Sequence, residues 1–286
     1  MNVIITTLSL GINYTKDYCL RLIEDVLLLS DCEIYITTDC SNLIYEKFPN
    51  NSRIKIKEIN RENLKVRIPI GKTKFSSDFN FNMRYLCLEH VQDVPNSIVI
   101  FTDCDNSFNF WDKQQVLEFF NEKKSLGFDF YGPRTDWKFK DIYEIFDQKC
   151  KGNPDLIDLN TSDCTMMWHK FFNYDLVDPN TLKVKDGILD ELQNSPLPAE
   201  YLLIFDNREY KLKKFVEKWK YLHDYLVNKD YSYGTWAEGF EIGVSSNFAN
   251  FKDYDITFNH PLWSKIFTAN GYKTGPRGGI VHATEY

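Results

Sequence analysis

The feature that most constrains the fold is an alternation of strand-like and helix-like segments over the first hundred residues. Apolar, β-branched runs at Val3–Leu8, Glu33–Thr38 and Ser97–Thr102 are typical of strands. Arg53–Ile59 alternates Ile with Lys, as a half-exposed edge strand does. Apolar residues recur at helical spacing in two segments between them: Tyr18, Leu22, Ile23, Val26 and Leu27, then Phe79, Met83, Leu86, Cys87 and His90. Strand, helix, strand, strand, helix, strand is the order of an α/β domain whose sheet has parallel pairs.

The second half of the chain is less regular. Short strands are expected at Gly127–Tyr131, Cys164–Trp168 and Tyr201–Phe205. Apolar residues from Leu212 to Leu226 recur at helical spacing and predict an amphipathic helix. Its polar face carries five lysines: Lys211, Lys213, Lys214, Lys218 and Lys220. We interpret them as a solvated face; peripheral contact with an anionic membrane surface is the alternative.

The composition excludes several classes of protein. Lys and Arg total 34 against 41 Asp and Glu, a net charge of −7, which argues against binding to nucleic-acid phosphates. No apolar run approaches the roughly 18 residues of a transmembrane segment, and the first residues lack the pattern of a signal peptide. The seven cysteines are scattered without a C-x-x-C pair, which fits a reducing compartment. We therefore expect a cytoplasmic protein.

Two aspartates follow the most apolar strand. Ile98–Phe101 is a run of four bulky apolar residues, typical of a strand buried on both faces, and Asp103 and Asp105 follow it. Residues two apart in an extended backbone point the same way, so the two carboxylates converge. Converging carboxylates repel each other unless a cation lies between them. Mg²⁺-like ions keep one or two protein carboxylates and take other ligands from phosphates and water. The pattern therefore indicates a metal-held diphosphate at a strand end, where α/β sheets bind ligands.

The triplet Asp103-Cys104-Asp105 after a buried strand resembles the D-x-D motif of the metal-dependent glycosyltransferases with the GT-A fold. The resemblance covers most of the chain. It implies a single α/β domain over residues 1–286, with a Rossmann-type, mixed and mainly parallel central sheet flanked by helices. Residues 1–106 would form the half that binds nucleotide sugar and metal. Residues 107–286 would form the acceptor-binding half with a C-terminal tail.

The same resemblance implies the residues that contact the donor. Thr6 and Thr7, at the end of the segment that resembles the family's first strand, are expected near the nucleobase. Asp39, after the second strand, matches the usual contact to base or ribose. Arg84, before the D-x-D strand, matches a basic residue that approaches the donor. Asp103 would contact both donor and metal.

Metal and acceptor contacts also follow from the resemblance. A divalent ion, Mn²⁺ or Mg²⁺, would be held by Asp103, Asp105 and His282, which is placed like the C-terminal histidine of many GT-A enzymes. Glu238 and Glu241 lie three residues apart in a helix-like segment, on one face. One of them is the candidate base that removes the proton of the acceptor hydroxyl in an inverting enzyme.

The predicted function is transfer of a sugar from a UDP- or GDP-linked donor to a hydroxyl of a glycan or other acceptor. Two alternatives stay open. A phosphohydrolase of the haloacid dehalogenase type would use Asp103 as its nucleophile and Asp105 as acid/base. It also needs a later acidic pair, and no Asp-Asp or Gly-Asp-x-x-x-Asp follows residue 106. A non-catalytic sugar- or nucleotide-binding module on the same scaffold is the second alternative, although binding alone gives no reason to keep a strained acidic pair.

Overall fold

The computed structural model describes residues 1–64, 83–138, 196–198, 200–228, 237–256 and 260–268. Its helices are α1 (Ile12–Tyr14), α2 (Leu20–Leu29), α3 (Ser41–Lys47), α4 (Tyr85–Val91), α5 (Lys113–Ser125), α9 (Lys211–Asn228), α10 (Ala237–Phe248) and α11 (Trp263–Ile266). A π-helical turn (Thr15–Cys19) joins α1 to α2, and 3-10 turns occur at Arg61–Asn63 and Asn207–Glu209. The strands are β1 (Asn2–Ser9), β2 (Glu33–Thr38), β3 (Ile54–Glu58), β4 (Ser97–Thr102), β5 (Ser107–Phe108), β6 (Phe130–Gly132), β7 (Arg134–Lys138), β8 (Pro196–Pro198), β9 (Leu202–Asp206), β10 (Asp253–Asp255) and β11 (Phe267–Thr268).

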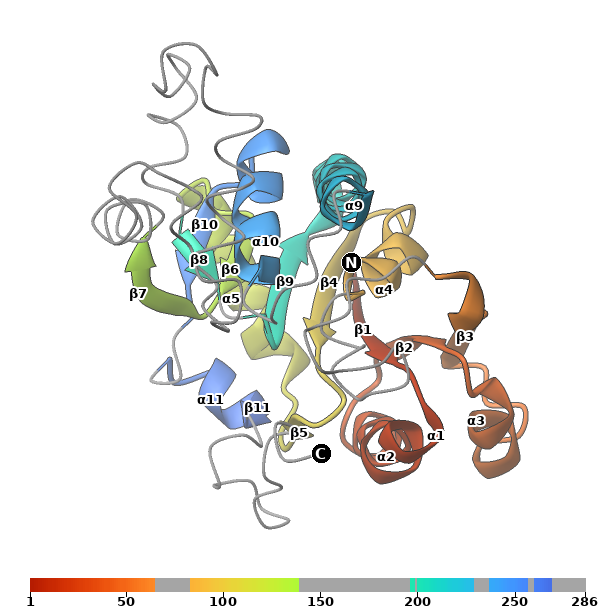
Figure 1. Cartoon of the computed structure of the whole chain (residues 1–286). Helices are drawn as coiled ribbons and strands as arrows, with labels where there is room; N and C mark the ends of the chain where they lie inside the picture. The colour runs from red at the N-terminus through yellow and green to blue at the C-terminus, as the bar shows by residue number, and fades with distance from the viewer. Residues whose placement is uncertain (65–82, 139–195, 199, 229–236, 257–259, 269–286) are drawn as a thin grey trace.

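Within the described residues, seven strands form one sheet in the order β10-β6-β9-β4-β1-β2-β3 (Figure 1). β1 pairs in parallel with β2 and β4, β2 with β3, and β6 with β10. β9 runs antiparallel to both β4 and β6. The predicted α/β fold with a mixed, mainly parallel sheet flanked by helices is therefore confirmed. The sheet joins strands from before and after residue 106; the division of function at that residue stays a prediction.

Alternating side chains of β4 enter two apolar cores, one on each face of the sheet. Ile98 and Ile100 contact the core shared with α2 and α5, whereas Val99 and Phe101 contact the core shared with α4, α9 and α10. Figure 1 shows α4 and α9 on one side of the sheet and α2 on the other. Every residue of β4 is buried, as expected for a strand between two helical layers. The largest buried side chains of the two cores, such as Trp219 on α9, contribute most to the apolar area removed from water.

The sequence prediction located most strands of the sheet but not all elements. β2 and β4 have the predicted bounds, β3 forms the expected edge, and β9 is displaced from the prediction by one residue. The strand expected at Gly127–Tyr131 is shorter and begins at Phe130. The prediction passed directly from the second strand to the third and missed α3. That helix buries only Ser41 and Ile44, too few positions for a visible helical period. The strand expected at Cys164–Trp168 lies outside the described residues.

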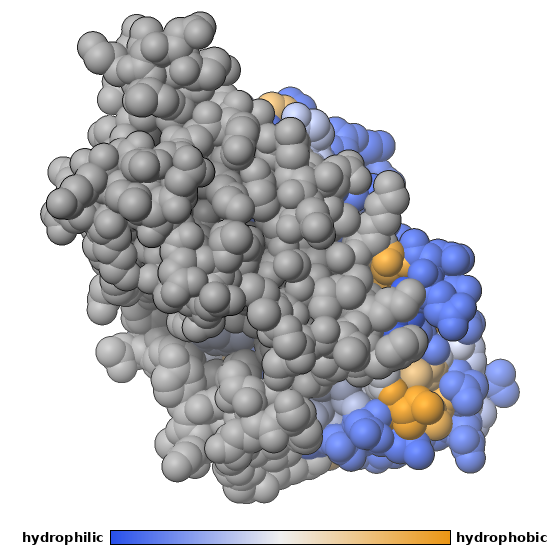
Figure 2. Space-filling model, viewed as in Figure 1, coloured by the Kyte–Doolittle hydropathy of each residue, from blue (hydrophilic) through white to orange (hydrophobic). Residues whose placement is uncertain are grey.

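The outer face of α9 is polar, as expected. Three of its lysines form ion pairs with carboxylates: Lys211–Asp129, Lys213–Asp93 and Lys220–Glu89. No helix within the described ranges is both long and apolar enough to cross a membrane. On the face drawn in Figure 2, the described surface is mostly hydrophilic, with small hydrophobic spots. These features fit a solvated face, and membrane contact stays a prediction.

Candidate active site

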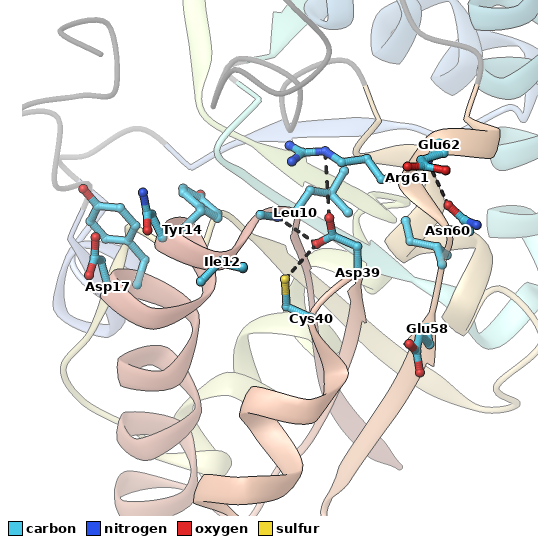
Figure 3. Close-up of a pocket in the computed structure, with 14 residues that line it drawn as sticks. Leu10, Ile12, Tyr14, Asp17, Asp39, Cys40, Glu58, Asn60, Arg61 and Glu62 are labelled. Carbon is cyan, nitrogen blue, oxygen red and sulfur yellow. Dashed lines mark hydrogen bonds and ion pairs between the residues drawn. The ribbon is translucent and has the colours of Figure 1, made fainter.

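A cavity of about 1060 Å³ lies at the carboxyl ends of β1, β2 and β3. Figure 3 shows Ile12, Tyr14 and Asp17 on one wall and the residues after β3 on the other, with Asp39 between them. The cavity is lined by Leu10, Gly11, Ile12, Asn13, Tyr14, Asp17, Tyr18, Asp39, Cys40, Glu58, Ile59, Asn60, Arg61 and Glu62. Its volume is at the upper end of the usual range for small-molecule sites.

Asp39 is fixed in this cavity by its neighbours. Its Oδ1 accepts a hydrogen bond from the Gly11 backbone N–H at 2.7 Å and one from the Cys40 thiol at 3.3 Å. Burial, together with the charge of Asp39, raises the pKa of Cys40 to about 11, so this thiol stays protonated and can donate. The other carboxylate oxygen lies 3.9 Å from Nε of Arg61. The cavity therefore presents an oriented carboxylate beside a guanidinium.

Gly11 permits this arrangement because of its backbone conformation. It has φ of 94° and ψ of 145°, a region that residues with a side chain rarely adopt. The turn lets its N–H point at Asp39 while its carbonyl accepts the N–H of Thr15 at 3.0 Å. A Cβ at this position would lie 3.3 Å from Nη1 of Arg61. A side chain here would therefore press on the residue that faces Asp39.

The second part of the site is the acidic loop that follows β4, defined as residues 103–106. Arg84, directly before α4, donates two hydrogen bonds to the carboxylate of Asp103: Nε to Oδ1 at 2.8 Å and Nη2 to Oδ2 at 2.7 Å. Both side chains are buried. Nη1 of the same guanidinium lies 3.9 Å from a carboxylate oxygen of Glu200, just before β9. Arg84 thus faces carboxylates from two distant segments of the chain.

Tyr14 lines the cavity and is near enough to the acidic loop to be affected by its charge. Desolvation raises the pKa of Tyr14 well above its usual value, and Asp105, Cys104 and Asp103 raise it further. A phenol kept protonated between two carboxylates and a cavity can donate a hydrogen bond to an anionic ligand that spans both.

The topology of the sheet places both parts at one crevice. From β1 the chain proceeds to β2 and β3 on one side, and β4 then pairs with the opposite edge of β1. The order of strands therefore reverses between β1 and β4, and open α/β sheets bind ligands beyond the carboxyl ends at such a point. The cavity follows β1, β2 and β3, and the acidic loop follows β4.

Asp103 and Asp105 are the described carboxylates that the sequence assigns to a divalent ion. Within the described part of the chain, no three His, Cys, Asp or Glu side chains converge as a ligand set. Both oxygens of Asp103 accept from Arg84, but each retains a further lone pair, and Asp105 is half-buried. Two such carboxylates fit a Mg²⁺ or Mn²⁺ ion that takes its remaining ligands from phosphate and water. They do not by themselves form a complete protein cage.

The other predicted site residues are distributed as follows. Thr6 and Thr7 are buried and donate to the carbonyls of Cys87 and Thr102 at 3.0 and 2.7 Å, so they support the sheet and do not line the cavity. Glu241 is also buried. His282 lies outside the described residues. The role of each of them in binding or catalysis stays a prediction.

The two glutamates on α10 have different positions. Glu241 accepts a hydrogen bond from the indole Nε1 of Trp219 on α9 at 2.8 Å and is enclosed between the two helices. Glu238 lies in the first turn of α10. The structure thus brings Arg84, Asp103 and Asp105 together, places Asp39 in the adjoining cavity, and holds Glu241 in a core.

Sequence reasoning missed Tyr14, Arg61 and Glu200. Arg61 could have been found by applying the strand-end rule to the third strand as well as to the second. Tyr14 could have been found as the first aromatic residue after the glycine that ends β1. Glu200 carries no local signal, because its position depends on β9 pairing with β4, about a hundred residues away in sequence.

No protein-family model and no curated protein matches the sequence. The solved structures that the chain resembles include three glycosyltransferases. Mouse xyloside xylosyltransferase 1 matches with a TM-score of 0.45 and 10% identity, over 90% of this chain and 86% of that one. The galactosyltransferase LgtC matches with a TM-score of 0.41 and 12% sequence identity, over 84% of this chain and 70% of LgtC. The bifunctional glycosyltransferase WbbM matches with a TM-score of 0.35 and 10% sequence identity, over 81% of this chain and 37% of the WbbM chain. At these values the likeness is distant, and no residue of this chain takes a role from it.

Proposed function

We propose that this protein transfers a sugar from a nucleoside diphosphate sugar to an acceptor hydroxyl. The observation that supports this most directly is the position of the cavity and the acidic loop at the carboxyl ends of the neighbouring strands β1 and β4. A nucleoside needs a concave site with a few oriented polar groups. A diphosphate needs cations or a metal site beside it. The two requirements are met next to each other at one crevice of the sheet.

In this proposal the cavity holds the nucleoside. The carboxylate of Asp39 accepts hydrogen bonds from N–H groups of a base or from ribose hydroxyls, and the nearby guanidinium of Arg61 donates to base carbonyls. Because the Gly11 N–H already fixes Asp39, little ordering is needed when the ligand binds.

The acidic loop holds the diphosphate end of the donor. Asp103 and Asp105 would hold a divalent ion, with His282 proposed as a further ligand. When bound, such an ion stabilises the negative charge that develops on the leaving diphosphate, as a Lewis acid does. Arg84 keeps the carboxylate of Asp103 in one orientation. Tyr14 donates a hydrogen bond to a phosphate oxygen, because burial, and then the charge of Asp105, raise the pKa of its phenol and keep it protonated.

Glu238 and Glu241 are the two candidates for the general base that deprotonates the acceptor hydroxyl, and we assign this role to Glu238. A general base must reach the hydroxyl that it deprotonates, within hydrogen-bond distance or through one water. Glu241 is fully buried against Trp219, which leaves it no such reach in this structure. It serves in the proposal as an acceptor that joins α10 to α9.

The hydrolase alternative gains no support from the site. A covalent nucleophile needs an electron-rich carboxylate oxygen directed at phosphorus, and the bidentate guanidinium of Arg84 lowers the nucleophilicity of both Asp103 oxygens even though each keeps a lone pair. A binding module without activity would use the same cavity and loop, so the two are separated by experiment.

The test combines thermal unfolding with a donor screen. Ligands that bind only the folded state raise the melting temperature, by an amount that grows with concentration over Kd. We expect Mn²⁺ together with UDP or GDP to raise it more than the sum of each alone. Slow hydrolysis of one sugar nucleotide in a panel should then identify the donor. Cooperative binding with no turnover of any donor, with or without sugar acceptors, would favour the binding module. Phosphatase activity with metal alone would favour the hydrolase.

A further inference from the structure

Arg21 is a buried arginine whose contacts lie under the acidic loop. It is the second residue of α2 and is 9% exposed. Its Nη2 atom donates toward three consecutive backbone carbonyls: Asp105 at 3.1 Å, Asn106 at 3.1 Å and Cys104 at 3.5 Å. Its Nε is also buried and has no hydrogen-bond partner among the described residues. Within the described residues, the hydrogen bonds of this guanidinium are therefore all directed at one loop.

This contact fits the curled shape of the loop, in which the N–H of Asn106 also donates to the carbonyl of Asp103 at 3.2 Å. Three successive carbonyls can approach one nitrogen only when the backbone curls around it, away from the extended path of β4. Partial negative charges brought together in this way repel each other unless a cation faces them. Hydrogen bonds to a charged donor are also shorter and stronger than those between neutral groups. Arg21 thus favours the curled form of the loop over alternatives.

Other contacts fix the two ends of the loop. The N–H of Asp103 donates to the carbonyl of Tyr201 at 3.1 Å. The side-chain amide of Asn106 donates to the same carbonyl at 2.8 Å and to the hydroxyl of Thr102 at 2.9 Å. Arg21 holds the segment between these ends, where Asp105 lies.

We infer that Arg21 is a positioning residue that orients the Asp105 carboxylate by holding the backbone of the acidic loop. Within the described residues, its hydrogen bonds reach the loop through backbone oxygens. This inference rests on the proposed function for what the loop binds. The part that concerns the shape of the loop stands on the contacts of Arg21 alone.

The chain offers a matched control in Arg53. This half-buried arginine also donates to backbone carbonyls, of Ser30 at 2.5 Å and Val26 at 3.4 Å, but at the opposite end of α2. Arg53→Met removes a comparable set of contacts without touching the acidic loop. Arg21→Met removes the contacts of interest, and Arg21→Lys keeps the charge with a single donor group.

The experiment measures loop opening and ion binding in the same variants. Amide hydrogen exchange of peptides covering residues 103–106 should be at least 10-fold faster in Arg21→Met and unchanged in Arg53→Met. Titration with Mn²⁺ in the presence of UDP, and separately of GDP, followed by electron paramagnetic resonance, should show at least 10-fold weaker binding in Arg21→Met. Arg21→Lys should recover part of both losses, whereas Arg53→Met should bind within 2-fold of the native chain.

The outcomes test the positioning role of Arg21 separately from the proposed function. Loop exchange and Mn²⁺ binding that stay at native levels in Arg21→Met would overturn the positioning role. The same holds if Arg53→Met weakens binding equally, because the effect would then be one of general stability. If the native chain binds no Mn²⁺ with either nucleotide while Arg21→Met still speeds exchange of the loop, the proposed function fails and the loop-holding role stands.

Discussion

Arg84 holds both carboxylate oxygens of Asp103, at 2.8 and 2.7 Å, in a pair that is almost completely buried. The pair links the residue before α4 to the residue after β4, so it fixes the first aspartate of the acidic loop to the helical layer above the sheet. The aspartates at 103 and 105 therefore differ in kind. Asp103 is buried and paired with a guanidinium, whereas Asp105 is half-buried.

Removing one member of this pair should be costly. Arg84→Met leaves a buried carboxylate without its partner and is expected to lower the free energy of unfolding by about 3–5 kcal/mol. Arg84→Met combined with Asp103→Asn should cost less than the sum of the single changes, because neither charge is then stranded. Urea titrations of the four proteins give the coupling energy. A coupling near zero would show that the pair does not act as a unit.

Asp105→Asn should remove metal-dependent nucleotide binding and leave the fold intact. An amide is a neutral and weaker ligand for a hard cation than a carboxylate, so affinity for Mn²⁺ with UDP or GDP should fall by more than tenfold. The melting temperature without ligand should shift by no more than about 2 °C, because a substitution at a half-buried loop residue changes stability little. Asp93→Asn, on an exposed turn far from the site, is the control. Unchanged nucleotide affinity in Asp105→Asn would contradict the proposed function.

Gly11→Ala should weaken nucleotide binding in the cavity and also lower the stability of the protein. Its φ of 94° and ψ of 145° disfavour any side chain, at a cost of about 1–3 kcal/mol. The new Cβ would also press on Arg61, 3.3 Å away. Gly127→Ala is the matched control, because Gly127 also has a positive φ, of 82°, but its Cβ would meet only the flexible end of Lys252. Calorimetric titration with nucleotide should show weaker binding for Gly11→Ala alone, although both variants lose stability.

His90 should make the protein less stable at acidic pH. Burial, and then the charge of Lys57, lower the pKa of His90 to about 4 in the native state. The unfolded chain has a histidine pKa of about 6.5, so between pH 6.5 and pH 4 the unfolded state binds more protons. Stability is therefore full above pH 6.5 and falls as the pH drops toward 4. We expect a loss of about 1–2 kcal/mol at pH 5, reduced by the partial exposure of the ring.

The measurement is a comparison of urea unfolding at pH 5 and pH 7. His90→Leu keeps an apolar contact with Tyr35, whose ring lies 5.2 Å from the imidazole. The variant should lose less stability than the native chain between the two pH values. Equal losses in both proteins would show that groups other than His90, such as carboxylates or His260, account for the change.

Local patterns predicted the strands of the first hundred residues because three are apolar runs and β3 alternates apolar and charged residues. They also predicted Asp103 and Asp105 as strand-end residues, since ligands bind at the carboxyl ends of strands in such sheets, whereas Asp39 followed from the family resemblance. They could not predict that Arg84 would pair with Asp103 or that Arg21 would lie under the loop. Those contacts depend on how α2 and α4 pack, and helix packing is not encoded by residue spacing alone.

The antiparallel strand β9 has a consequence for how the protein is made. It shields one side of β4, and the carbonyl of Tyr201 beside it accepts from both Asp103 and Asn106. A nascent chain that has emerged only to residue 106 therefore exposes β4 as a bare apolar edge, the kind of edge that recruits other chains into aggregates. About a hundred further residues must leave the ribosome before that edge is covered. Synthesis of this protein should accordingly depend on chaperones that protect β4 during that interval.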